Sequence, residues 1–140
     1  MEYKVIYFTR TGTSKRIAEK IAAKLSCESI QITDNMNWKG IIGFLKGGYY
    51  ASLDKDVDIK TSKKIEAFDE LVVVSPLWAG GIAPAVKVFL KSISAQKVNL
   101  VITSNGSSIK NRIGYKSVTD IIKSNNDEDV VISNLIDRLL

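Results

Sequence analysis

A loop near the start of the chain gathers the side chains best suited to binding chemistry. Its six residues supply four hydroxyls, one cation and one glycine: Thr9, Arg10, Thr11, Gly12, Thr13 and Ser14. An apolar run before the loop and a helical pattern after it place the loop between a strand and a helix N-terminus. Free backbone N–H groups and the positive end of the helix dipole attract an anion at such a place. Because capping a helix needs only one hydroxyl, four of them favour a phosphate site over a simple cap.

Two more loops with unusual residues follow apolar runs at residues 71–74 and 98–102. The first contains Pro76, Leu77, Trp78, Ala79, Gly80 and Gly81, and the second contains Ser104, Asn105 and Gly106. Because the carboxyl ends of parallel strands meet at one edge of a sheet, we expect the three loops to form one site. Each later loop also has a plainer interpretation, namely a core position for Trp78 and ordinary turns at Gly80-Gly81 and at Asn105-Gly106.

The elements that must position these loops alternate along the chain between apolar runs and amphipathic stretches. We expect helices at residues 17–25, 84–93, 115–122 and 134–140, with Thr13 as the N-cap of the first, and strands at 5–8, 28–33, 71–74, 98–102 and 130–132. The run at 28–33 alternates between apolar and polar residues, as an edge strand does. A further helix is favoured around Trp38, and Tyr49 and Tyr50 then begin a polar loop, but the role of residues 34–60 stays open.

This order of elements predicts one α/β domain over residues 1–140. Continuous apolar runs are typical of parallel strands that are covered on both faces. With right-handed crossovers, the expected architecture is a doubly wound, five-stranded parallel sheet of strand order 2-1-3-4-5, in a three-layer sandwich.

The composition excludes several kinds of chemistry. The chain has 140 residues, no histidine and one cysteine, Cys27. Ser-His-Asp and Cys-His systems, His-containing zinc sites, CxxC motifs and an internal disulfide are therefore excluded. No apolar run approaches the ~20 residues of a membrane span, and neither a secretory leader nor a nucleic-acid motif is visible. With its lone cysteine, the chain is expected to be cytoplasmic.

The loop sequences differ from the better-known nucleotide motifs, because neither GxGxxG nor GxxxxGK[ST] is present. Residues 9–14 instead resemble the phosphate loop of the flavodoxin family, [ST]-x-T-G-x-[ST] after the first strand, with Thr13 where that family most often has Asn. Residues 75–81 and the segment 83–90 also resemble the flavin-contacting loop of short bacterial flavodoxin-like proteins. The element order extends the resemblance over nearly the whole chain.

The resemblance implies a noncovalently bound FMN. The residues of the first loop would hold its 5′-phosphate, and Trp78, beside Pro76 and Leu77, would lie against the isoalloxazine ring. Ala79, Gly80 and Gly81 would place backbone groups near the N5 and O4 atoms of the ring. Ser104, Asn105 and Gly106 would close its pyrimidine side. An aromatic side chain stacked on a planar ring also excludes water from it.

The expected function is therefore that of an electron carrier that exchanges low-potential electrons with redox partner proteins. An FMN-dependent NAD(P)H:quinone-type oxidoreductase and a flavin-free binding module are the alternatives. The net charge of +5 departs from the acidic carriers of the family, so acidic partners are one option for docking. A monomer and a homodimer both remain open.

Overall fold

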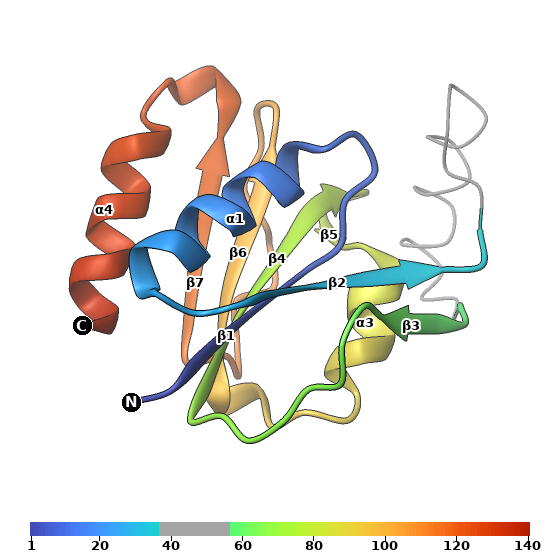
Figure 1. Ribbon diagram of the computed structural model, residues 1–140. Coiled ribbons are helices and arrows are strands. Elements are labelled where there is room, and N and C mark those ends of the chain that lie inside the picture. Colours follow the sequence, from blue (N-terminus) through green and yellow to red (C-terminus); the bar gives the residue numbers. More distant parts are fainter. Residues whose placement is uncertain (37–56) are drawn as a thin grey trace.

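The structure is a computed structural model that describes residues 1–36 and 57–140. Five strands run parallel in the order β2-β1-β4-β6-β7, which Figure 1 shows as the central sheet. These strands are β1 (Tyr3–Tyr7), β2 (Ser29–Asp34), β4 (Glu70–Trp78), β6 (Val98–Ser104) and β7 (Ser117–Ile122). Two short strands pair antiparallel with them: β3 (Ile59–Thr61) with β2, and β5 (Gly81–Ile82) with β4.

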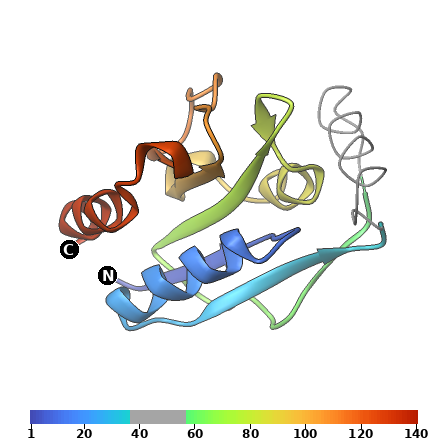
Figure 2. The same cartoon turned by 90° about the horizontal axis from the view of Figure 1, so that it is seen from above.

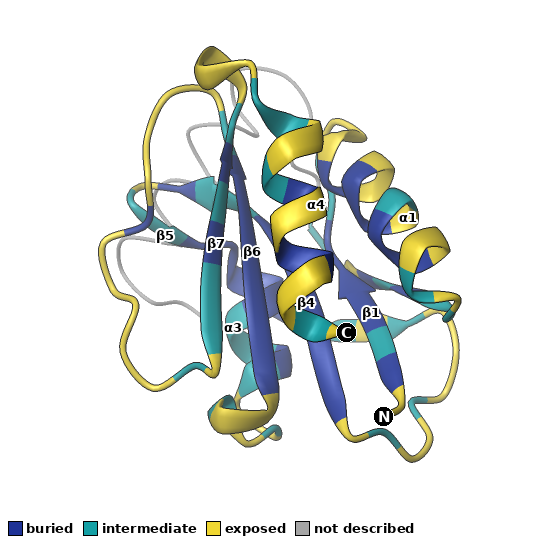
Figure 3. Cartoon of the chain, turned by 90° about the vertical axis from the view of Figure 1, so that its left-hand side faces the viewer, coloured by how far each residue is buried: buried dark blue, intermediate teal, exposed yellow. Residues whose placement is uncertain are grey.

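Helices cover both faces of this sheet (Figure 2). On one face lie α1 (Thr13–Leu25) and α4 (Glu128–Leu139), and on the other lies α3 (Pro84–Leu90). Figure 3 shows α1 and α4 side by side, each with its buried residues turned toward the strands. Two 3-10 turns complete the described elements, η1 (Ala95–Lys97) and η2 (Lys123–Asn125). None of the helices in the described part of the chain is long and apolar enough to cross a membrane.

The central strands divide their side chains between the two layers. In β1, Val5 and Tyr7 pack under α1 and α4, while Ile6 packs in the core beneath α3. The same alternation in β4 sends Val72 and Val74 to one side and Val73 to the other. Because both faces are covered, these strands are apolar throughout. The predicted α/β class is correct, and the sheet is mostly rather than entirely parallel.

The sheet has seven strands in the described residues rather than the five parallel strands expected. Residues 28–33 do form a strand, but it is not an edge strand, because β3 pairs along its outer side. The hairpin strand β5 was not anticipated either. Both added strands are only two or three residues long, which is too short for alternation to reveal them. The predictions at Trp38, Tyr49 and Tyr50 lie outside the described residues.

The last quarter of the chain differs most from the sequence-based prediction. Residues 115–122, expected to be helical, contain strand β7, and residues 130–132, expected to be a strand, lie inside α4. The segment SVTDII is rich in β-branched residues, which favour a strand over a helix. In α4, Ile132, Leu135 and Ile136 recur at helical spacing and are buried, whereas Val130 is exposed. No helix lies between β6 and β7; residues 105–116 cross as a loop.

A cluster of charges fastens α4 to α1. The guanidinium of Arg16 donates to both carboxylate oxygens of Glu128, at 2.6 and 2.8 Å. Lys20 donates to Glu128 and to Asp129, at 2.8 Å each. The hydrogen bonds from Arg16 and Lys20 lower the pKa of Glu128 to about 2. The carboxylate is therefore a strong anchor between the two helices at neutral pH.

Glu128→Gln should lower the free energy of unfolding by about 1–2 kcal/mol near pH 7. The pKa of Glu128 is lower in the folded than in the unfolded chain, so its contribution is complete above about pH 4.5 and is lost as pH falls toward 2. Urea unfolding of both proteins between pH 7 and pH 2 measures this, with the exposed Glu19 of α1 changed to Gln as the matched control. If the free energy of unfolding of wild type exceeded that of Glu128→Gln by the same amount down to pH 2, the ionised Glu128 would not stabilise the contact between α1 and α4.

Candidate functional site

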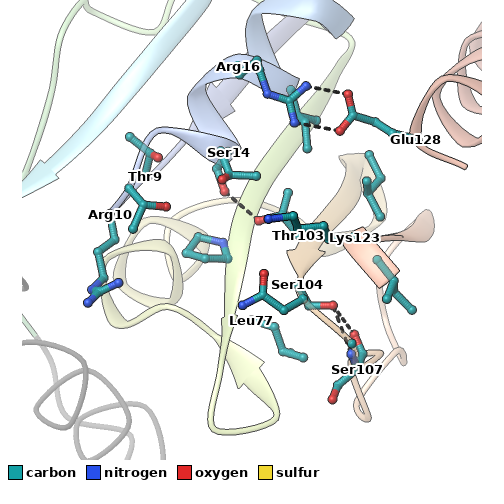
Figure 4. Close-up of a pocket in the computed structure, with 18 of the residues that line it drawn as sticks. Thr9, Arg10, Ser14, Arg16, Leu77, Thr103, Ser104, Ser107, Lys123 and Glu128 are labelled. Carbon is teal, nitrogen blue, oxygen red and sulfur yellow. Dashed lines mark hydrogen bonds and ion pairs between the residues drawn. The ribbon is translucent and has the colours of Figure 1, made fainter. Parts of the chain in front are cut away.

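A cavity of about 550 Å³ opens where the carboxyl ends of β1, β4 and β6 meet (Figure 4). The start of α4 and the end of β7 form its remaining wall. The lining residues are Thr9, Arg10, Thr11, Thr13, Ser14, Arg16, Ile17, Pro76, Leu77, Trp78, Thr103, Ser104, Asn105, Gly106, Ser107, Ile121, Ile122, Lys123, Asn126, Asp127 and Glu128. The three loops singled out in the sequence therefore meet at one place. Of the predicted site residues, only Gly12, Ala79, Gly80 and Gly81 are not among those lining the cavity.

The first loop leaves the N-terminus of α1 unblocked. Gly12, rather than the predicted Thr13, is the N-cap, with a left-handed φ of 102°. Its N–H donates to the hydroxyl of Thr9 at 2.9 Å. The first turn of α1 carries no acidic residue and no side-chain cap, and a Cβ at Gly12 would meet nothing within 4 Å. Backbone N–H groups, hydroxyls and open space therefore coincide, as an anion site requires.

Two buried hydroxyls join this loop to the centre of the sheet. The Oγ of Ser14 and the Oγ1 of Thr103 lie 2.9 Å apart in a hydrogen bond (Figure 4). Ser14 is 2% exposed and Thr103 is 5% exposed, and both side chains line the cavity. Thr103 stands near the end of β6, directly before the third loop. The bond therefore links the first loop to the third.

The second loop is a tight hairpin between β4 and β5. Ala79 and Gly80 occupy its centre with positive φ values of 51° and 80°, as in the type I′ turns that suit twisted strands. Trp78 pairs with Gly81 across the turn. The buried hydroxyl of Ser75 accepts from the N–H of Ala83 at 3.1 Å and fixes the far side of the hairpin. Ala79 and Gly80 thus form the turn, and Gly81 begins β5.

Trp78 is both a buried core residue and part of the cavity wall. It is 9% exposed and packs edge-on against Phe8, with ring centres 5.6 Å apart and planes at 84°. It also lines the cavity. Trp78→Ala would therefore remove core packing as well as a wall of the site.

The third loop is held at two points. The backbone N–H of Ser124 in η2 donates to the carbonyl of Asn105 at 3.0 Å. The hydroxyl of Ser104 donates to the carbonyl of Ser107. Further along, the carboxylate of Asp120 accepts from the N–H of Ile109 at 3.0 Å and pairs with Arg112. These bonds order a crossing that contains no helix.

The wall contributed by the segment from η2 to the start of α4 was missed in the sequence. Lys123, Asn126, Asp127 and Glu128 line the cavity, but predicting a strand at residues 130–132 placed them away from the site. In the described part of the chain, the Oδ1 atom of Asp127 is buried and has no hydrogen-bond partner. Asp127 is the N-cap of α4 without making a side-chain cap bond. The acidic triplet at 127–129 was the available indication of a helix start.

Solved flavoproteins share this architecture. A flavoprotein from Lactobacillus acidophilus, solved in complex with FMN, is 17% identical and has a TM-score of 0.66, covering 92% of this chain and 97% of its own. A WrbA-like flavodoxin from Agrobacterium tumefaciens is 13% identical and has a TM-score of 0.51, covering 99% of each chain. No protein-family model and no curated protein matches the sequence. At these identities the likeness establishes a flavodoxin-like fold, which is the fold that the sequence resemblance implied.

The hairpin geometry leads to a prediction about stability. Ala79 is exposed and holds a left-handed φ, which Asn tolerates better than Ala does. Ala79→Asn should therefore raise the free energy of unfolding by about 0.5–1 kcal/mol, measured by urea unfolding. Ala79→Val is the matched control and should lower it, because branching at Cβ disfavours positive φ. Equal free energies of unfolding for Ala79→Asn and Ala79→Val would argue against a left-handed conformation at residue 79.

Proposed function

We propose that this protein binds FMN in the cavity at the carboxyl ends of β1, β4 and β6 and serves as an electron carrier. The observation that carries the proposal is the meeting of three separate loops at one cavity, with the hydroxyl loop and the unblocked N-terminus of α1 on one side. The FMN complex of the Lactobacillus acidophilus flavoprotein, which shares the fold, supports the choice of ligand.

The residues present fit the chemical parts of FMN. A volume of about 550 Å³ lies within the range of small-molecule sites. Thr11, Thr13 and Ser14, with the N–H groups of α1, supply uncharged donors for a phosphate, and Arg10 adds a positive charge. Pro76, Leu77 and Trp78 supply an apolar wall for a planar ring. The unpartnered Oδ1 of Asp127 is an acceptor suited to a ligand hydroxyl.

When bound, FMN supplies the redox chemistry, and the protein's part is to bind, orient and shield it. The hairpin at Ala79 and Gly80 presents backbone groups next to the apolar wall. Ser104 and Asn105, held by the bonds to Ser107 and Ser124, form the opposite side. Ordered loops keep these groups in place before the ligand arrives, which reduces the entropy lost on binding.

Electron carriage is put before catalysis because the charged surface suits docking to a partner protein. The exposed Lys110 and Lys123 and the net charge of +5 suit docking to acidic redox partners. An FMN-dependent NAD(P)H:quinone-type oxidoreductase remains the alternative function, since the flavin would carry that chemistry as well.

Titration of the purified protein with FMN and with riboflavin tests the ligand directly. We expect flavin fluorescence to be quenched by FMN with a Kd below about 1 μM. Thr11→Val combined with Thr13→Val should weaken FMN at least about tenfold and change riboflavin little, because each hydroxyl lost removes a charge-assisted hydrogen bond. Ser94→Ala, an exposed hydroxyl before η1, is the matched control. No saturable quenching by wild-type protein would overturn the proposal.

Steady-state assays separate the carrier from the oxidoreductase. We expect the FMN-loaded protein to show no turnover of NADH or NADPH with a quinone acceptor. Reduction by dithionite and reoxidation by an electron-accepting protein should both proceed, and the second should slow as salt screens the basic surface. If the purified protein oxidised NAD(P)H over multiple turnovers, the proposed function would be that of an oxidoreductase and not that of an electron carrier.

A further inference from the structure

We infer that Thr103 is a positioning residue for phosphate: its hydroxyl donates to Ser14, so that the Ser14 proton is directed at the ligand. This inference rests on the proposed function and adds a residue that lies outside the hydroxyl loop. The two side chains are 89 positions apart in sequence and meet only because the end of β6 lies beside the first turn of α1.

The proton count of the pair gives the direction of the bond. Each hydroxyl has one proton to donate, and either oxygen can be the donor in the bond of 2.9 Å. A phosphomonoester at neutral pH carries mostly acceptor oxygens, because its second pKa is about 6. If Ser14 donates to such an oxygen, the bond within the pair can persist only with Thr103 as its donor. The anion thereby fixes the polarity of both hydroxyls.

The place of Ser14 makes it the member of the pair that contacts the anion. It belongs to the first turn of α1, where the backbone N–H groups have no helical partners. Thr103 belongs to the strand beneath it and is held in register by β4 and β7. Both side chains are almost fully buried, so the bond is shielded from competing water. In such surroundings a chain of hydrogen bonds strengthens cooperatively.

The same bond joins the two ends of the proposed ligand site. Thr103 directly precedes Ser104 and Asn105, which line the cavity away from the first loop. Fixing Thr103 from the phosphate side therefore also restrains the start of the third loop. We expect the preference for a phosphorylated flavin to depend on a residue that does not touch the phosphate.

The test compares FMN with riboflavin in Thr103→Val, Thr103→Ser and Ser14→Ala. The ratio of the two affinities isolates the phosphate and is insensitive to general damage to the cavity. Thr103→Val, which keeps the side-chain shape, should lower this ratio about tenfold, and Thr103→Ser, which keeps the hydroxyl, should restore most of it. Inorganic phosphate should protect the apoprotein less from urea in the Val variant than in wild type.

A double variant measures whether the two hydroxyls act together. Because Thr103 acts through Ser14, adding Thr103→Val to Ser14→Ala should lower the affinity ratio little further. Additive losses would overturn the inference. So would a Thr103→Val variant that keeps the wild-type ratio, or one that weakens FMN and riboflavin equally. If the wild-type protein itself showed no preference for FMN over riboflavin, the proposed function would fail together with the inference. If only the Thr103 variants behaved differently from the expectation, the inference would fail and the proposed function would stand.

Discussion

The parallel pairing of β1, β4 and β6 is the constraint on which the rest of the molecule depends. Their registered backbone hydrogen bonds bring the carboxyl ends of three distant segments to one edge of the sheet. Burial of their apolar side chains on both faces makes that arrangement rigid. The loops that follow begin at these strand ends, so the strands set where each loop starts. The cavity is therefore a result of strand order, and loop sequence determines only what the cavity can hold.

Two helix N-termini border the cavity, and their charges are arranged differently. The first turn of α1 has no acid, so its positive end is left for a ligand. The first turn of α4 carries Glu128 and Asp129, which already neutralise its end and also hold Arg16 and Lys20. The guanidinium of Arg16 is thereby kept at the cavity wall by an internal partner. An anion is thus directed toward the end of the cavity formed by the N-terminus of α1.

The meeting of the three loops at one cavity was predicted more accurately than the elements in the last quarter of the chain. Hydroxyls and glycines after apolar runs are local features, and the order of the runs was enough to bring them together. The strand at 117–122 and the first half of the helix at 128–139 were misassigned because short runs of Val and Ile fit both periods. The helix expected at 134–140 does lie within α4 except for its last residue. Thr103 could not be predicted, since its importance arises from a contact across 89 residues.

Because no helix lies between β6 and β7, the length of the segment that joins them can change. Where a helix normally covers the sheet, residues 105–116 form an ordered loop held chiefly by Asp120 and by the turn at η2. Its middle is exposed, with Ile113 89% accessible. Surface loops tolerate insertion and deletion far better than packed helices do. This crossing is therefore the segment in which relatives can diverge in length, or in which an engineer can insert a foreign peptide, while β7 and α4 keep their places.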